Sequence, residues 1–258
     1  MIYWLSCAMD EVPLDGEGIS PSLSFPSEQE RAVCQGFRFA KRRDEWLLGR
    51  WTAKQLLRRS LAEYKNVPLA EIAVANDPDG APYYRVDGQR LPLCLSISHR
   101  AGRALCALSG THAVGADLER IEPREPAFVE DFFTVSENAQ VRAASDVTRN
   151  LLVTLIWSAK ESALKVLRQG LRIDTRKIEI TFDESLDEIQ MSSVKRQTST
   201  EYAIRNTQHY PWHPLHVEFR LPNAPRFAAW WQIDGPNVLT LVAAIPAGST
   251  DLPDIRVA

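Results

Sequence analysis

Apolar residues recur with helical spacing in two long segments of the chain. From about Asp44 to Tyr64 the pattern predicts a helix whose apolar stripe contains Trp46, Leu47, Trp51, Leu56, Leu57 and Leu61. A second long helix is predicted from about Val147 to Arg168, with Gly170 in the position that commonly follows a helix end. A shorter helix precedes the first, because Ser27 and Glu30 have the spacing of a capping box.

Strand patterns occupy the segments around these helices. Residues Leu93 to Ser98 alternate, and Leu105 to Leu108 follow a turn, so the two predict a hairpin; Val114 to Glu119 predict a further strand. The first ten residues also read as a strand, and residues 10 to 26 read as a loop. After residue 173 the chain is β-rich and includes a predicted hairpin of residues 227–233 and 238–245. The order predicts an α+β fold, with a boundary between lobes near residues 111 to 116.

Composition limits the class of function. The hydrophobic share of 45% and charged share of 24% are typical of a soluble globular protein. The net charge of −3 gives no overall attraction to nucleic acid or to an anionic membrane, so any anion-binding role has to come from local clustering. The four cysteines lack zinc-site spacing. Neither a signal peptide nor a run of transmembrane length is recognisable, which predicts a cytoplasmic protein.

The segment V-G-A-D-L-E-R places two carboxylates on one side of the third predicted strand. Residues two apart in a strand point the same way, so Asp117 and Glu119 share a face while Val114, Ala116 and Leu118 face a core. Two adjacent carboxylates repel each other unless a cation lies between them or water solvates them. The motif alone fits either a cation site or the exposed polar face of an edge strand.

The segment I-W-S-A-K-E-S-A-L-K places charged side chains and a tryptophan along one face of the second long helix. Trp157, Glu161 and Lys165 are spaced i, i+4, i+8 and form one stripe, which Lys160 flanks. A solvated face with one favourable Glu–Lys pair is the alternative interpretation, although the Trp in the stripe favours a covered surface.

Two further motifs offer donors for an anion. S-I-S-H at residues 96–99 brings hydroxyls and an imidazole to a strand end, where a structural His is the alternative; a Ser-His hydrolase lacks support, because no G-x-S-x-G motif is present. Lys41 to Arg43 lie near a helix start, where cations and backbone N–H groups can act together on an anion. We interpret Lys54, Arg58 and Arg59 as a solvated helix face.

Taken together, these motifs resemble the paired signature of the 4′-phosphopantetheinyl transferases. V-G-A-D-L-E followed by W-S-A-K-E-S-A-L-K carries the resemblance. S-I-S-H, F-A-K-R-R-D-E-W-L-L-G-R at residues 39–50 and F-F-T-V-S-E at residues 132–137 fit the larger, two-lobed, Sfp-like members. The resemblance covers residues 25 to 170 and matches nothing in the remainder.

The resemblance implies a fold and an activity. The fold would have two pseudo-symmetric α+β lobes with the active site between them. Residues 1–114 would contact the nucleotide of coenzyme A, and residues 115–258 would supply the metal ligands and the lysines that bind the diphosphate. Such enzymes, of the holo-[acyl-carrier-protein] synthase type, move the phosphopantetheine arm of coenzyme A to a serine of an apo acyl or peptidyl carrier protein and release 3′,5′-ADP.

The resemblance also implies roles for the acidic and basic residues of the paired signature. Asp117, Glu119 and Glu161 would hold Mg²⁺, which Mn²⁺ can replace, and Glu119 is the least secure of the three. Lys165 and Lys160 would neutralise the diphosphate. Glu161 would take the serine proton or act only as a ligand, with a metal-bound water as the base; the sequence does not decide between them.

Coenzyme contacts are implied in the first lobe. Ser98 and His99 would lie at the 3′-phosphate. Lys41 takes the place of a basic residue that binds the same end of coenzyme A, and Arg43 is a second candidate. The turn D-G-A-P resembles the family's Gly-Lys-Pro loop, which packs on adenine, so Gly80 and Ala81 are contact residues; Ala81 replaces the Lys.

Two other functions stay open at this level: a Mg²⁺-dependent nucleotide or diphosphate hydrolase, and an inactive carrier-binding protein. A nucleic-acid-binding module disagrees with the acidic balance. We therefore expect a monomer whose partners are coenzyme A and an acidic carrier protein. Neither nucleic acid nor a membrane is expected as a partner.

Overall fold

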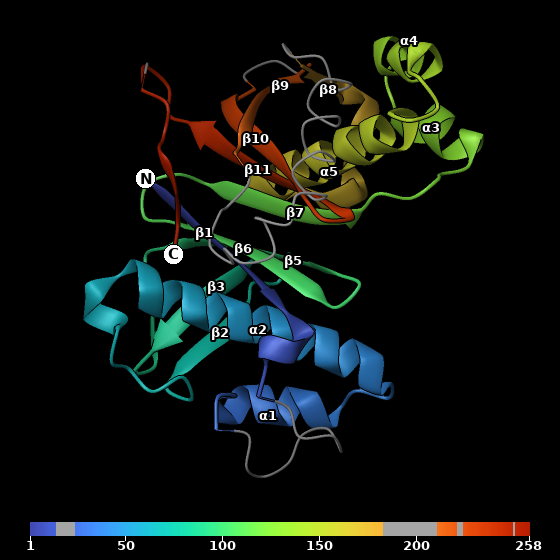
Figure 1. Ribbon diagram of the computed structural model, residues 1–258. Helices are drawn as coiled ribbons and strands as arrows, with labels where there is room; N and C mark the ends of the chain where they lie inside the picture. Colours follow the sequence, from blue (N-terminus) through green and yellow to red (C-terminus); the bar gives the residue numbers. More distant parts are fainter. Residues whose placement is uncertain (14–23, 183–210, 221–223, 250) are drawn as a thin grey trace, which may run out of the picture.

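The computed structural model describes residues 1–13, 24–182, 211–220, 224–249 and 251–258, so most of the predicted loop at 10–26 lies outside the described residues. Two β-sheets lie against each other at the centre, and a long helix covers the outer face of each (Figure 1). Among the described helices, none is both long and apolar enough to cross a membrane. The α+β class predicted from the sequence is confirmed.

The first sheet has the strand order β12-β1-β6-β5. Its members are β1 (Ile2–Ala8), β5 (Cys94–Arg100), β6 (Arg103–Ser109) and β12 (Ile255–Val257). Helix α2 (Ala40–Ser60) packs against β1, β5 and β6, and α1 (Glu28–Gln35) precedes it. A small sheet of β2 (Ile72–Asn76), β3 (Pro82–Val86) and β4 (Gln89–Arg90) follows. The predicted hairpin is β5 paired with β6.

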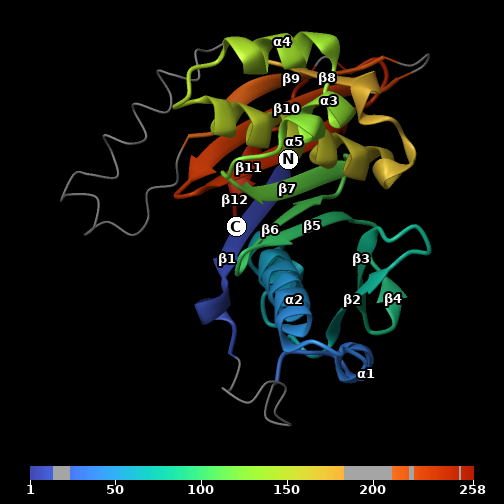
Figure 2. The ribbon, with the colours of Figure 1, turned by 90° about the vertical axis from the view of Figure 1, so that its right-hand side faces the viewer.

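The second sheet has the order β7-β11-β10-β9-β8. Its strands are β7 (Val114–Arg120), β8 (Ile178–Thr181), β9 (His213–Phe219), β10 (Arg226–Asp234) and β11 (Asn237–Ile245). Helix α5 (Arg149–Leu167) packs on β7 and β11, with α3 (Pro126–Phe132) and α4 (Val135–Ala143) beyond it (Figure 2). The predicted hairpin of residues 227–233 and 238–245 is β10 paired with β11.

The two halves share a core between the sheets. Apolar side chains of β1 and β6 meet those of β7 and β11 there: Ile2, Trp4, Leu105, Ala107, Val114, Ala116, Leu118, Leu239, Leu241 and Ala243. Strand β12 pairs in parallel with β1, so the end of the chain adds a strand to the sheet of the first half. The division at residues 114 and 115 stays a prediction, and this pairing crosses it.

Helix ends differ from the predicted ones for local reasons. Helix α2 begins at Ala40, four residues before the predicted start, because the three residues that follow Ala40 are all basic and the apolar periodicity begins only after them. Helix α5 ends at Leu167, and the residue in the left-handed conformation is Arg168 (φ 56°). Gly170, predicted to follow the helix end, instead begins a short 3-10 helix at residues 170–172.

A buried ion pair anchors the first half. Glu30 forms the capping box of α1 with Ser27, and its Oε1 accepts a hydrogen bond from the backbone N–H of Val74. Its Oε2 lies 2.5 Å from the ammonium of Lys54, which also donates to the carbonyls of Phe25 and Leu69. Lys54 is completely buried, so its interpretation as part of a solvated helix face was wrong.

The second half repeats this arrangement. Glu137 forms the capping box of α4 with Thr134 and accepts a hydrogen bond from the backbone N–H of Ile180. Its Oε2 lies 2.8 Å from the ammonium of Lys160, which also donates to the carbonyls of Thr175 and Ile178. The two lysines occupy the same place in W-T-A-K of α2 and W-S-A-K of α5. The repetition supports the pseudo-symmetry of the two halves.

Removing one partner of the second pair should destabilise the protein strongly. Lys160→Met leaves the carboxylate of Glu137 buried without its counter-charge, which costs about 3–5 kcal/mol. Adding Glu137→Gln should recover part of the loss, because the amide is neutral and its oxygen still accepts one of the two backbone hydrogen bonds, from Thr134 or from Ile180. Urea unfolding of both variants measures this, with the exposed Lys177→Met as the control. Equal stability of Lys160→Met and the control would contradict the prediction.

Candidate active site

The site is built where strands β5 and β7 of the two sheets run side by side. Ser96 accepts a hydrogen bond from the backbone N–H of Ala116 (2.9 Å), and the hydroxyl of Ser98 donates to Asp117 Oδ1 (2.8 Å). Alternation along β5 turns both serines toward β7 and leaves His99 on the other side, beside Gly49 of α2. The serines therefore join the halves, Ser96 at the backbone of Ala116 and Ser98 at the carboxylate of Asp117.

Asp117 is buried and only partly satisfied. The ammonium of Lys165 donates to Asp117 Oδ1 (2.9 Å) and to the carbonyl of Ala116 (2.8 Å). Asp117 Oδ2 is buried, and no hydrogen-bond partner for it occurs among the residues that the structure describes. A buried carboxylate oxygen without a partner is energetically costly, so this atom is a candidate ligand for a group outside the protein.

Helix α5 brings Glu161 and Lys165 to Asp117 because Gly115 lets the helix lie directly on β7. A Cβ atom at residue 115 would lie 1.9 Å from the carbonyl oxygen of Ser162, between the two functional positions of the helix. Glu161 is half-buried. Its pKa is raised, first by burial and then by the charge of Asp117, and Lys165 opposes the shift.

Glu119 shares the face of Asp117 but has other partners. Its Oε2 lies 3.2 Å from Arg124 and 3.6 Å from Arg100. Burial raises the pKa of Glu119, and the charge of Asp117 adds to the shift. The predicted common face of Asp117 and Glu119 is therefore present, and two arginines that sequence reasoning missed hold the second carboxylate.

The carboxylates of Asp117, Glu119 and Glu161 are oxygen donors, the kind of ligand that a hard cation binds. Within the described ranges, no three His, Cys, Asp or Glu side chains come together in an arrangement that could hold a metal ion. Asp117 nevertheless has a buried oxygen without a partner, and its charge raises the pKa of both glutamates. A cation bound by carboxylate oxygens would relieve both effects, and oxygen donors are the ligands that Mg²⁺ prefers. The chemistry of these oxygen donors fits Mg²⁺, and Glu119 is the donor already engaged by Arg124 and Arg100.

The raised pKa of Glu161 has a consequence for stability. A carboxyl whose pKa is higher in the folded state destabilises the fold when ionised, and this cost disappears below its pKa in the unfolded chain, about 4.3. Glu161→Gln should therefore raise the Tm at neutral pH with a metal chelator present, and the difference should shrink on acidification. Thermal unfolding over a pH series measures it. A lower Tm at neutral pH would contradict the interpretation.

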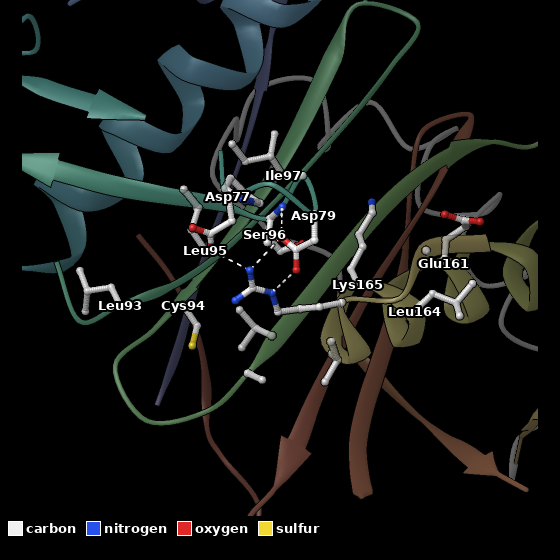
Figure 3. Close-up of a pocket in the computed structure, with 18 of the residues that line it drawn as sticks. Asp77, Asp79, Leu93, Cys94, Leu95, Ser96, Ile97, Glu161, Leu164 and Lys165 are labelled. Carbon is white, nitrogen blue, oxygen red and sulfur yellow. Dashed lines mark hydrogen bonds and ion pairs between the residues drawn. The ribbon is translucent and has the colours of Figure 1, made fainter. Parts of the chain in front are cut away.

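A cavity of about 290 Å³ lies beside these groups. Its wall combines the β2–β3 turn, strand β5 and the end of α5 (Figure 3). Gly80 and Ala81 lie in the turn, and Gly80 adopts a φ of 89°, which favours glycine. Glu161 and Lys165 line the same cavity. The structure thus places Gly80 and Ala81 of the first half in the same cavity as Glu161 and Lys165 of the second. The roles of these residues stay predictions.

Other predicted site residues lie elsewhere. Lys160 is completely buried, and its ammonium is bound to Glu137 and two carbonyls, so its assignment to the diphosphate was wrong. The hydroxyl of Ser98 is bound to Asp117, and its contact with the nucleotide stays a prediction. Lys41 and Arg43 begin α2 and do not line the cavity; Arg43 pairs with Asp44.

Sequence reasoning missed two arginines in the cavity wall and assigned no role to a third one beside it. Arg90 and Arg168 line it. Arg50 is buried and donates to Asn76 Oδ1 (2.6 Å), and Asn76 in turn donates to the carbonyl of Gly80 (2.6 Å). Arg90 and Arg168 belong to no recognisable motif, so the sequence offered no signal for them, whereas Arg50 ends the motif at residues 39–50.

Comparison with known proteins connects this geometry to a family. The model of the 4′-phosphopantetheinyl transferase superfamily matches residues 113–219, which include Asp117, Glu119, Glu161 and Lys165. The 4′-phosphopantetheinyl transferase psf-1 of Bacillus pumilus is 26% identical over 155 residues, 60% of this chain and 62% of the relative. The 4′-phosphopantetheinyl transferase HetI of Nostoc sp. is 26% identical over 147 residues, 56% of this chain and 60% of the relative.

Among solved structures, a holo-(acyl-carrier-protein) synthase from Bacillus anthracis in complex with CoA (3′,5′-ADP) is similar, with 25% identity and a TM-score of 0.35. The match covers 42% of this chain and 91% of that one. The sequence matches extend over about 60% of the length of the first two curated relatives. The chain is thus similar to the 4′-phosphopantetheinyl transferase superfamily over residues 113–219 and to these relatives over 56–60% of its length.

Proposed function

We propose that this protein transfers the 4′-phosphopantetheine group of coenzyme A to a serine of an apo acyl or peptidyl carrier protein and releases 3′,5′-ADP. The observation that carries the proposal is the buried, partly unsatisfied carboxylate of Asp117, held by Lys165 beside an inter-lobe cavity. Lys165 and Glu161 belong both to this cavity and to the segment that matches the superfamily. The relatives named as such transferases add support.

Asp117 and Glu161, with Glu119 as a third candidate, would hold Mg²⁺, and Mn²⁺ is an alternative. When bound, the cation supplies charge neutralisation at the diphosphate. Lys165 adds a second positive charge from the protein, since its ammonium reaches the oxygen of Asp117 and lines the cavity. Ser98 fixes the orientation of Asp117 through a hydrogen bond of 2.8 Å. Positioning and neutralisation of this kind account for most of the catalysis in phosphoryl-type transfer.

The transfer step requires one proton acceptor. The carrier serine oxygen bonds to the β-phosphorus of coenzyme A as the bond from that phosphorus to the bridging oxygen breaks, and 3′,5′-ADP leaves with that oxygen. The serine proton would go to Glu161, which lines the cavity together with Lys165. A water at the site is the alternative acceptor.

The partner is expected to be an acidic carrier protein. Its attraction to basic side chains near the site would weaken as salt increases, because exposed charges are screened. We place the reaction in the cytoplasm and expect a monomer.

Intact-mass measurement of an apo carrier tests the function. The carrier, incubated with coenzyme A, Mg²⁺ and this protein, should gain the mass of one phosphopantetheine, and the gain should disappear with a chelator. Release of 3′,5′-ADP without a carrier would support a hydrolase instead. A stable complex with the carrier and unchanged mass would support an inactive carrier-binding protein.

A further inference from the structure

Charged side chains from both halves meet in one wall of the cavity. Arg168, at the end of α5, donates through Nε to Asp79 Oδ2 (2.7 Å) and through Nη2 to Asp79 Oδ1 (2.8 Å) and Asp77 Oδ2 (2.6 Å). Both aspartates belong to the β2–β3 turn of the other half, and all of these residues line the cavity. Figure 3 shows the bonds converging on Asp77 and Asp79. These bonds tie α5 to the turn that carries Gly80 and Ala81.

The turn is also held from its own side. Arg90 donates to both carboxylate oxygens of Asp77, at 2.7 and 2.9 Å, and its guanidinium lies 4.1 Å from the centre of the Tyr83 ring. Arg168 therefore binds to a turn that Arg90 already holds in place, and it does not have to order a free loop. Because the turn is already ordered, less conformational entropy is lost when Arg168 forms its hydrogen bonds.

The net charge of this cavity wall determines whether an anionic group can bind next to it. Two arginines balance two aspartates, so the acidic turn presents no net negative charge to a phosphate group. The hydrogen bonds from Arg168 lower the pKa of Asp79 to about 2, and those from Arg90 lower the pKa of Asp77, so both carboxylates stay ionised and paired at neutral pH. Without Arg168, Asp79 would face the cavity as an uncompensated anion.

Resting on the proposed function, we propose that Arg168 is a positioning residue for the nucleotide of coenzyme A. It fixes the β2–β3 turn against the end of α5, and thereby sets the distance between the turn and Lys165 on the same helix. Its hydrogen bonds go to the turn, and the described residues show none from it to Asp117, Glu161 or Lys165. Its loss should therefore weaken nucleotide binding more than it slows the chemical step.

Arg168→Ala tests this through binding and kinetics together. We expect the Kd for 3′,5′-ADP, measured by calorimetry with a chelator, and the KM for coenzyme A each to rise about fivefold, with kcat within about twofold. Arg176→Ala is the matched control, because Arg176 makes the same kind of exposed pair with Asp174, two residues away, and does not line the cavity. It should leave both constants unchanged.

A charge exchange separates positioning from direct contact with the nucleotide. Arg168→Asp should weaken binding more than Arg168→Ala, and Arg168→Asp with Asp79→Arg should restore binding, because the link across the cavity is rebuilt with reversed charges. Failure of the exchange to restore binding, or equal constants for Arg168→Ala and the control, would overturn the inference. If the wild-type protein neither binds 3′,5′-ADP nor modifies a carrier, the proposed function fails and the inference fails with it.

Discussion

Asp117→Asn is expected to lower the rate of phosphopantetheine transfer by about 10³-fold while the protein stays folded. The amide keeps the shape of the side chain and can still accept the hydrogen bond from Ser98. The substitution removes the negative charge that pairs with the ammonium of Lys165 at 2.9 Å. It also replaces one of the two carboxylate oxygens, Oδ1 or the buried Oδ2 that has no partner among the described residues, by an NH₂ group, which donates hydrogen bonds. An amide is a weaker ligand than a carboxylate for a hard cation. Initial rates from intact-mass measurements of the carrier give the size of the effect.

The same substitution at an exposed aspartate is the control for Asp117→Asn. Asp146 is 92% exposed and pairs only with Arg149 on the surface among the described ion pairs, so Asp146→Asn should keep full activity. Urea unfolding of both variants shows whether the loss at Asp117 reflects chemistry or folding. A decrease of less than about tenfold for Asp117→Asn, with stability preserved, would remove Asp117 from the centre of the site.

Gly115→Ala should destabilise the protein by about 3 kcal/mol or more, because the added methyl group cannot be accommodated by a side-chain rotation. Its Cβ would lie 1.9 Å from the backbone carbonyl oxygen of Ser162 and 2.8 Å from the carbonyl carbon, so α5 itself has to move off β7. That helix carries Glu161 and Lys165. We therefore expect lost activity even at temperatures where the variant remains folded.

Gly110→Ala is the matched substitution. The Cβ there would meet only the side chain of Leu93, at 3.8 Å, which is an ordinary contact. Thermal and urea unfolding should show a small effect for Gly110→Ala and a large one for Gly115→Ala. Similar stabilities for the two variants would mean that α5 does not need its close approach to β7.

Local patterns were enough to predict the elements that carry the site. Period-two alternation correctly placed Asp117 and Glu119 on one face of β7, with Ala116 and Leu118 in the core. Helical spacing likewise placed Glu161 and Lys165 together in α5, and both line the cavity. These relations depend only on the geometry of one element, which neighbouring residues specify.

The same patterns were wrong wherever burial depends on a second element. Lys54 was interpreted as solvated and Lys160 as a phosphate ligand, and both are completely buried against carboxylates of other helices. A lysine on a helix looks the same in the sequence whether it faces water or a capping glutamate from another helix. Likewise, nothing in the sequence indicated that the hydroxyl of Ser98 bonds to Asp117 of the other sheet, and the expected contact of Ser98 with the nucleotide stays a prediction.

The sequence by itself thus determined the α+β class, the strand and helix that carry Asp117, Glu161 and Lys165, and the resemblance that these motifs share with the transferase superfamily. Only the tertiary structure decided which charged groups meet across the cavity, above all Arg168 with Asp77 and Asp79. The physical reason is the range of the interactions. Periodicity and capping act within a few residues, whereas these ion pairs form only after α5 has packed on β7 and the two sheets have joined.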